Sequence, residues 1–519
     1  MPSRSLAYLS CAVAALALAA CSGSRSPAEQ AAPPASSGVP EASAPPASST
    51  GTSSAPAQEG SEGNGNTGDA GPGDAAPAPT ASAPAIPCPD AVGDVYVTPG
   101  DLPPMTMALR GAIVGCALDT AFSIGDVTSK LAAKNVTGVV PTSGTTTYRI
   151  AYRTYRDDGV PGVSTARVYL PGTPRTAPLP VVAIAHPTEG LAPSCAPSMD
   201  PTDQDDLALP WAAHGFAVVA TDYAGLGNAG VQGYTDNHDQ AHSLLDSVRA
   251  LRALLDPSVL DQRVLLVGYS QGGGAVLASQ GLAGSYGVAG NVVAAVVFAA
   301  EYYARNDSFD YATMLAEPDA LTISTGISMP VVVAMRDYAF GYNVLGPSSA
   351  AATFPAGAQA GLASAIMSQC QAPFGAYLQG TALHVGDLWD DGFRRSLLAC
   401  TGNSTAADAD GGDATCSGIA AQFYTWMQND LVAPDPAGAP VLYVQGLDDS
   451  IMPPAEEAAC NIGELTAAGV DVQVCVDPPA EHTTVVPRNV AFALGWSEAK
   501  LYGGTLPACS SAGMPACQP

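Results

Sequence analysis

The stretch VLLVGYSQGGGAV, from Val264 to Val276, decides the fold. Apolar residues typical of a buried strand lead into Gly-x-Ser-x-Gly, and small residues typical of a helix follow. A strand, this turn and a helix form a nucleophile elbow, which holds a serine out from the edge of a sheet. The turn leaves no room for side chains at Gly268 and Gly272, so Ser270 is expected in a strained backbone conformation. The alternative is a glycine-rich turn in which the serine is incidental.

Apolar runs and helical runs alternate along the chain after Cys88. A β-hairpin is predicted on either side of residues 157–159, Asp-Asp-Gly. Continuous apolar runs, which are typical of strands covered on both faces, occupy residues 179–186, 215–227, 263–268, 291–300, 439–446 and 470–476. Residues 237–255 have the period of a helix. Strands that alternate with helices predict an α/β fold with a mostly parallel sheet.

A long segment, about residues 301–438, separates two of these predicted strands. It is far too long for a simple crossover between neighbouring strands. Clusters of aromatic, leucine and methionine residues occur within it, and strand signals resume after it. We therefore expect an inserted, largely helical cap. Its aromatic side chains are equally consistent with an acyl pocket and with a core of the cap's own.

The charge of the chain excludes one class of partner. The formal net charge is −28, with only 19 lysines and arginines. Binding to nucleic acid requires cations that neutralise phosphates. We therefore expect no nucleic-acid partner and a substrate that is not an anion.

The N-terminus indicates export. Residues 1–21 combine one early arginine with a short apolar run that closes on small residues, as in a signal peptide. The end of this run resembles a bacterial lipoprotein signal, with Cys21 as the lipidation site. Such a chain is anchored to a membrane through its lipid alone, whereas ordinary cleavage near Ala20 releases a secreted protein. Residues 22–87 are rich in Ala, Pro, Ser and Gly and predict a disordered tether. Residues 88–519 then form the catalytic domain.

Ten cysteines remain after Cys11 and Cys21 are set aside. An even number in an exported chain predicts disulfides. Proximity in sequence favours the pairs Cys460–Cys475 and Cys509–Cys517. The absence of a CxxC pair argues against a zinc site. His238 and His242 have the i, i+4 spacing of a metal site, but no third ligand is apparent, and we interpret them as solvated helix residues.

A nucleophilic serine needs a base and an acid, which follow it in this fold in the order acid, then histidine. Two histidines follow Ser270. His384 lies in the expected cap, whereas His482 follows the last predicted strand and is the expected base. The acid is expected after the preceding strand, where Asp448 and Asp449 are equally compatible with the pattern.

The chain resembles the secretory lipase family of α/β-hydrolases, the yeast lipase A type and its bacterial relatives, from about Asp94 to Trp496. The stretches that carry the resemblance are HPTEGLAPSCAPS, GFAVVATDYAGLG, LLDSVRALRAL, VGYSQGG, QGLDDSIMPP and EHTTVV. The resemblance implies an α/β-hydrolase fold. Its G-x-x-D spacing selects Asp449 as the acid. The chain departs from the bacterial relatives in having His-Pro-Thr where they commonly have His-Gly-Thr.

Two backbone N–H groups are needed to bind the oxyanion that forms on the substrate. One is expected from Gln271, directly after the serine. For the other, the spacing of the family back from Cys195 points to Glu189, with Thr188 as its neighbour, and Pro187 has no N–H to donate. The Glu189 side chain either turns to solvent or, if burial keeps it protonated, donates a further hydrogen bond.

The sequence thus predicts an exported serine hydrolase that cleaves small-molecule or lipid carboxylic esters through an acyl-enzyme. It needs no metal or organic cofactor. One alternative is a serine exopeptidase with the same triad. The other is a non-catalytic surface binding module on a hydrolase fold, although no member of the triad is missing from the sequence.

Overall fold

The computed structural model describes residues 84–518 except 101, 158, 175–177, 201, 203, 302–314, 316–328, 382–383 and 403–414. The chain divides into two units, Met1–Ala75 and Ala76–Pro519, and every described residue belongs to the second. The predicted signal peptide, Cys21 and most of the predicted tether lie outside the described residues. Within the part that is described, no helix is both long and apolar enough to cross a membrane.

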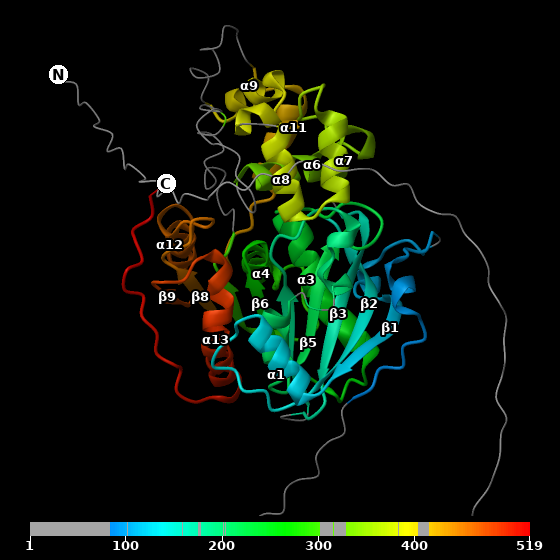
Figure 1. Cartoon of the computed structure of the whole chain (residues 1–519), viewed down its shortest axis with the longest axis vertical. Coiled ribbons are helices and arrows are strands. Elements are labelled where there is room, and N and C mark those ends of the chain that lie inside the picture. The colour runs from blue at the N-terminus through cyan, green and yellow to red at the C-terminus, as the bar shows by residue number, and fades with distance from the viewer. Residues whose placement is uncertain are drawn as a thin grey trace, which may run out of the picture. The chain divides into compact units, whose positions relative to one another are not determined.

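A nine-stranded sheet forms the centre of the second unit, with the order β1-β2-β3-β5-β4-β6-β7-β8-β9 (Figure 1). The strands are β1 (Ile113–Phe122), β2 (Thr145–Tyr155), β3 (Pro161–Pro171), β4 (Leu179–Ala185), β5 (Ala217–Ala224), β6 (Leu260–Tyr269), β7 (Asn291–Phe298), β8 (Val441–Gly446) and β9 (Val472–Asp477). The predicted hairpin is β2 and β3, which pair antiparallel. From β5 through β4 to β9 every neighbouring pair is parallel. The sheet is therefore mostly parallel, as the sequence predicts.

Helices cover both faces of the sheet, which explains why its central strands are mainly apolar on both faces. Successive residues of β4 belong to different cores. Val181 and Ala183 pack in one core with residues of α3 (Asn237–Leu254), α4 (Gln271–Leu282) and α12 (Ala459–Ala468). Val182 and Ile184 pack in the other with residues of α1 (Ile124–Ala133), α2 (Asp205–Ala212) and α13 (Val485–Tyr502). A strand with no solvent-facing side therefore favours apolar residues on both of its faces.

The segment between β7 and β8 forms the expected helical cap. Its described helices are α6 (Met329–Asn343), α7 (Gln359–Ser368), α8 (Gln371–Thr381), α9 (Asp391–Cys400) and α11 (Gly418–Asn429), which lie together at one edge of the sheet (Figure 1). They bury a hydrophobic core of their own, in which Phe340 and Phe423 pack edge to face at 4.8 Å. Leu191, Val231 and Tyr234, from loops after β4 and β5, belong to the same core. The cap is therefore packed against the sheet domain through shared apolar contacts.

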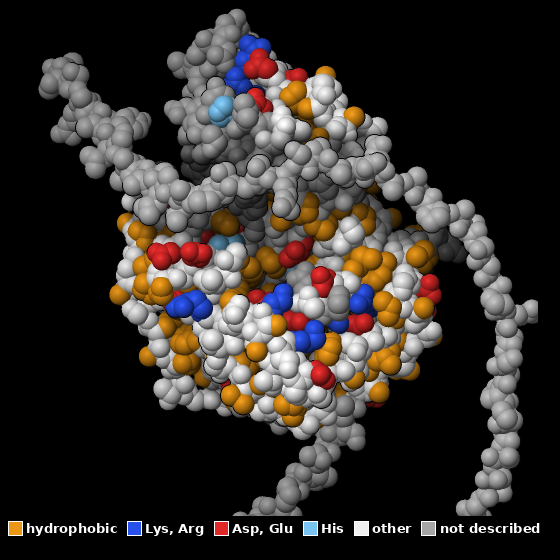
Figure 2. Space-filling model, in the orientation of Figure 1, with side chains coloured by type: hydrophobic (Ala, Val, Ile, Leu, Met, Phe, Trp, Pro, Cys, Tyr) orange, Lys and Arg blue, Asp and Glu red, His pale blue; other side chains and the backbone are white. Residues whose placement is uncertain are grey.

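The surface of the sheet domain carries both signs of charge. Figure 2 shows lysine and arginine side chains interspersed with aspartate and glutamate on the face in view. Several of them form ion pairs, such as Arg488 with Asp477 at 2.7 Å. The negative net charge of the chain therefore does not produce a uniformly acidic surface on this face.

Five disulfides join the ten cysteines: Cys88–Cys116, Cys195–Cys370, Cys400–Cys416, Cys460–Cys517 and Cys475–Cys509. The expectation of disulfides is confirmed, but both pairs favoured by proximity are wrong.

The course of the C-terminal segment explains this error. After α13 the chain runs back along β9, where Val476 N–H donates to the Ser510 carbonyl at 2.8 Å, and this brings Cys509 beside Cys475. The chain then continues towards α12, where Gln518 N–H donates to the Ala455 carbonyl. Proximity in sequence therefore gave the wrong disulfide pairs, because the C-terminal segment runs past β9 and then past α12.

Candidate active site

The turn after β6 has the geometry of a nucleophile elbow. Ser270 has φ 55° and ψ −120°, a conformation that residues with a side chain rarely adopt. A Cβ on Gly272 would collide with the Ala185 carbonyl, and one on Gly268 would collide with the Gly272 carbonyl. Two hydrogen bonds hold this conformation: Ser270 N–H donates to the Phe298 carbonyl at 3.0 Å, and the Ser270 carbonyl accepts from Glu301 N–H at 2.9 Å. The strained turn predicted from the glycines is therefore present.

His482 lies directly beside Ser270. It begins a single 3₁₀ turn, His482–Thr484, in the loop after β9. Its Nε2 is 2.9 Å from Ser270 Oγ, and its Nδ1 is 2.9 Å from Asp449 Oδ2. The side chains of His482 and Asp449 are 2% and 0% exposed. Tyr269 packs against the imidazole and donates its hydroxyl to the His482 carbonyl at 2.9 Å, so both the ring and its backbone are held.

The two candidate acids have different environments. Asp449 is buried, and its Oδ1 accepts from the N–H groups of Ile451 at 2.9 Å and Met452 at 2.8 Å. Asp448 is exposed, and its backbone N–H donates to the Ala480 carbonyl. The structure therefore brings Asp449 to the histidine. The other candidate base, His384, lies in the cap, where it precedes a 3₁₀ turn.

The residues expected to bind the oxyanion come from two loops. Gln271 is the first residue of α4, and the N–H groups in the first turn of a helix have no partner within the helix. The loop after β4 carries Thr188 and Glu189. The Thr188 hydroxyl is 2.9 Å from the Tyr234 hydroxyl, and the Glu189 carbonyl accepts from Gln371 N–H at 2.8 Å. The start of α8 therefore lies against this loop.

Further bonds fix the same loop to its surroundings. Cys195, a few residues along, is joined by a disulfide to Cys370, which directly precedes α8. Gly190 forms an isolated β-bridge with Cys370. Covalent and hydrogen-bonded contacts thus attach the cap to the loop that carries the second expected oxyanion donor.

Several buried polar residues of the sheet domain were not predicted. Asp222, at the end of β5, accepts from Ser198 N–H at 2.9 Å and from the Thr165 hydroxyl at 2.6 Å. Burial raises the pKa of Asp222 and lowers the pKa of His186, whose Nε2 lies 3.3 Å from the Asp222 carbonyl. Burial also raises the pKa of Glu457 to about 8. A single polar residue inside or beside an apolar run gives no pattern that predicts its hydrogen-bond partners.

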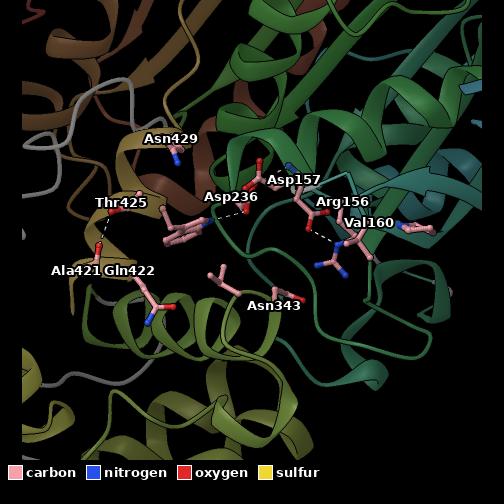
Figure 3. A pocket seen from close by; sticks show the side chains of 13 residues that line it. Arg156, Asp157, Val160, Asp236, Asn343, Ala421, Gln422, Thr425 and Asn429 are labelled. Carbon is pink, nitrogen blue, oxygen red and sulfur yellow. Dashed lines mark hydrogen bonds and ion pairs between the residues drawn. The ribbon is translucent and has the colours of Figure 1, made fainter. Parts of the chain in front are cut away.

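A pocket of about 580 Å³ lies where the cap meets the sheet domain (Figure 3). Its walls are Arg156, Asp157, Val160, Pro161, Asp236, Asp239, Asn343, Val344, Ala421, Gln422, Thr425, Trp426 and Asn429. Arg156 pairs with Asp239 at 2.5 Å, and Trp426 Nε1 donates to Asp236 at 3.2 Å. Ser270 and His482 are not among its lining residues. Trp426 lines this pocket and also packs with Phe340 and Phe423 in the core of the cap.

The interpretation as solvated residues is wrong for His242, which is buried, whereas the side chain of His238 is 23% exposed. His238 Nδ1 lies 3.6 Å from Asp157 and 3.5 Å from Asp430, and these carboxylates raise its pKa. His242 is 9% exposed and stacks on Tyr286 at 3.9 Å. Burial lowers the pKa of His242 to about 4. Within the described ranges, no group of three or more His, Cys, Asp or Glu side chains could hold a metal ion.

Residues 202–301 match the model of the secretory lipase family. This span includes β5, the elbow and β7, and it confirms the resemblance seen in the sequence motifs. No curated protein matches the chain.

Solved structures of lipases and esterases have the same fold. The rice cell wall degrading esterase LipA from Xanthomonas oryzae is 20% identical, with a TM-score of 0.55, and the match covers 76% of this chain and 97% of that one. Candida antarctica lipase A is 19% identical, with a TM-score of 0.55, and the match covers 81% and 90%. Its closed state is 19% identical, with a TM-score of 0.52, and the match covers 78% and 87%. The fold is therefore that of the α/β-hydrolases.

The family match and these neighbours together support a hydrolase of the lipase and esterase kind. The match to the secretory lipase family and the five disulfides of this chain also fit an exported protein.

Proposed function

We propose that the protein is an exported serine hydrolase that cleaves carboxylic esters through an acyl-enzyme intermediate. One observation carries the proposal. An unbroken and buried line of hydrogen-bonding atoms runs from Ser270 Oγ through both ring nitrogens of His482 to Asp449, with 2.9 Å at each step. This is the arrangement in which a neutral imidazole accepts the proton of a serine.

In the first half of the reaction, Ser270 Oγ attacks the ester carbonyl carbon while its proton passes to His482 Nε2. The negative charge that develops on the carbonyl oxygen is stabilised by the N–H groups of Gln271 and Glu189. Asp449 keeps the proton of the neutral imidazole on Nδ1 and stabilises the imidazolium that forms. The intermediate then expels the alcohol, which takes its proton from Nε2, and the acyl group remains on Ser270.

In the second half, a water molecule replaces the alcohol. His482 Nε2 accepts a proton from the water as it attacks the acyl carbon, and the same two N–H groups stabilise the second oxyanion. Collapse of this intermediate releases the acid and returns the proton to Ser270 Oγ. No step requires a metal ion or an organic cofactor.

Two features adapt the chain to this chemistry. The helix that begins at Gln271 directs its N-terminus at the site, which favours negative charge on the substrate oxygen. The strained backbone at Ser270 presents its hydroxyl to the imidazole, with Oγ 2.9 Å from His482 Nε2.

The N-terminal features extend the proposal to the location of the enzyme. We infer that residues 1–21 direct export, that Cys21 carries a lipid anchor and that residues 22–87 tether the catalytic domain to a bacterial membrane. Cleavage near Ala20 without lipidation would instead release a secreted enzyme. A small or lipid-like ester is the proposed substrate in either case.

The test is a comparison of substrates with the purified protein. We expect hydrolysis of p-nitrophenyl acyl esters, with no release of nitroaniline from aminoacyl nitroanilides. The Ser270→Ala protein, checked for folding by its melting temperature, should lose ester turnover. Preference for the nitroanilides would favour the exopeptidase, and a folded protein with neither activity would favour the binding module.

A further inference from the structure

Three buried glutamines form a chain of side-chain amides beside the active site. Gln271 Nε2 donates to Gln240 Oε1 at 2.8 Å and to Gln232 Oε1 at 3.1 Å. Gln232 Nε2 in turn donates to the Gly190 carbonyl at 2.7 Å. All three side chains are no more than 2% exposed. We call this line, from Gln240 through Gln271 and Gln232 to Gly190, the amide bridge.

Backbone carbonyls at its two ends fix the direction of every bond in the amide bridge. Because the Gly190 carbonyl can only accept, Gln232 must direct its NH₂ group there and its oxygen towards Gln271. Gln240 Nε2 donates to the Asp236 carbonyl at 3.0 Å, so its oxygen also faces Gln271. Gln271 must therefore direct its NH₂ group between the two oxygens. An amide flip at any of the three residues would bring like groups together.

The amide bridge joins the two loops that carry the proposed oxyanion donors. Gln271 supplies one of these N–H groups from its own backbone. Gly190 directly follows Glu189, which supplies the other, and has φ 127°, a backbone conformation that residues with a side chain rarely adopt. Between these loops the chain passes through α2, β5, α3 and β6. The Gln232 side chain contacts both loops through hydrogen bonds.

The distance between two oxyanion donors matters because they stabilise the transition state only where its charge develops. Donors that are already fixed there need no reorganisation during the reaction. A displacement of about 1 Å at a reacting centre can reduce the rate by about 100-fold. On the other side of the loop, the disulfide Cys195–Cys370 and the bond from Gln371 to Glu189 hold it against the cap. The hydrogen bond from Gln232 to the Gly190 carbonyl attaches the same loop to the sheet domain.

We propose that Gln232 is a positioning residue, which sets the spacing of the two oxyanion N–H groups through the Gly190 carbonyl and the Gln271 side chain. The proposal rests on the proposed function of Ser270, Gln271 and Glu189. Gln232 itself touches no reacting atom. Its effect should therefore fall on the stabilisation of the oxyanion rather than on substrate binding.

The first experiment compares Gln232→Met with Gln280→Met. Methionine has nearly the shape of glutamine and makes no comparable hydrogen bonds. Gln280 is a matched control, because it is also a buried glutamine, on the helix α4 that Gln271 begins, and its amide also bonds backbone, at 2.7 Å to the Asp435 carbonyl and 3.2 Å from Asp435 N–H. Gln232→Met should lower kcat by about 10- to 100-fold with KM within about threefold. Gln280→Met should keep the kcat of the unaltered protein.

The second readout separates a loss at the oxyanion hole from a general loss of order. A thionoester carries sulfur in place of the carbonyl oxygen, and sulfur is a weak hydrogen-bond acceptor. The unaltered enzyme should therefore prefer the oxygen ester, and Gln232→Met should narrow that preference by about tenfold. Equal losses on both substrates would mean that Gln232 only supports the fold, and would overturn the proposal.

Gln232→Glu provides a conservative rescue. A protonated glutamic acid can still donate to the Gly190 carbonyl, whereas a carboxylate would repel it. Activity relative to the unaltered enzyme at the same pH should therefore approach one in acid and fall as pH rises. A ratio that stays as low in acid as that of Gln232→Met contradicts the proposal.

The outcomes distinguish the positioning role of Gln232 from the proposed function. If Ser270→Ala retains full ester turnover, the proposed function fails, whatever Gln232 does. If Ser270→Ala is inactive while Gln232→Met has unchanged kcat and an unchanged ester to thionoester ratio, the positioning role alone fails. A melting temperature for each variant shows that folded proteins are being compared.

Discussion

Exchange of the two neighbouring aspartates for asparagine tests which one orients His482. The Asp449 carboxylate accepts from the N–H groups of Ile451 and Met452, from Gln445 Nε2 at 3.3 Å and from His482 at 2.9 Å. In Asp449→Asn, one oxygen must remain for the two backbone donors. The new NH₂ group therefore faces His482.

The wrong tautomer of His482 is the expected consequence. An NH₂ group opposite Nδ1 makes that nitrogen an acceptor and moves the imidazole proton to Nε2. The ring then cannot accept the proton of Ser270, and the charge that stabilised the imidazolium is lost. We expect kcat to fall by about 10⁴-fold, as for the equivalent change in other triads, which corresponds to about 5 kcal/mol of transition-state stabilisation. The crowded donors should also lower stability by about 1–3 kcal/mol.

Asp448→Asn is the matched control, because it makes the same chemical change one residue earlier at an exposed side chain. We expect its kcat/KM for a p-nitrophenyl ester to stay within about threefold of the unaltered value. The assay is the initial rate for both variants, with a thermal melt of each. A severe loss in Asp448→Asn with a mild one in Asp449→Asn would reverse the assignment. Small losses in both would refute the role of a carboxylate behind the histidine.

Three further outcomes are expected. Because burial raises the pKa of Glu457 from 4.5 to about 8, the folded chain keeps a proton that the unfolded chain releases, and its free energy of unfolding should fall as pH rises between these values. This loss of stability should be absent in Glu457→Gln. A stability difference between the two proteins that is constant from pH 4 to 9 would contradict the account. For Glu189→Gln, the pH dependence of kcat/KM should superimpose on that of the unaltered enzyme at alkaline pH if only the backbone N–H acts, whereas an extension to higher pH would show a protonated side chain at the oxyanion. A chain lacking residues 1–83 should keep its melting temperature and its ester turnover, and loss of folding would show that this segment contributes to the core.

Local patterns were sufficient to predict the sheet domain and the candidate triad. The glycines around Ser270 predict the strained turn, because the close backbone contacts of such a turn permit only glycine at these positions. The loop after the second-last strand carries an aspartate, and the loop after the last strand carries a histidine. This order predicts which residues lie next to the serine. The choice between Asp448 and Asp449 needed the resemblance to a family, since only the packing around the strand end distinguishes a buried carboxylate from an exposed one.

Features that depend on packing between distant segments could not be predicted in this way. Strand β1 was missed because it is an edge strand, with Leu118 57% exposed, and its pattern is too irregular to separate from a loop. The disulfide partners and the contacts of His242 arise where segments far apart in the sequence come together. Gln232 gave no signal, because a glutamine in a glycine-rich loop has the composition of an ordinary surface turn.

Identification of the residue that becomes acylated tests the central claim most directly. The purified protein would be inactivated with a p-nitrophenyl phosphonate, an ester analogue that leaves a stable adduct on a nucleophilic serine, and the adduct located by mass spectrometry of its peptides. We predict one adduct per chain, on Ser270, in proportion to the loss of ester turnover, and none in the Ser270→Ala protein. Complete inactivation with Ser270 unmodified, or an adduct on another residue that tracks the lost activity, would contradict the account.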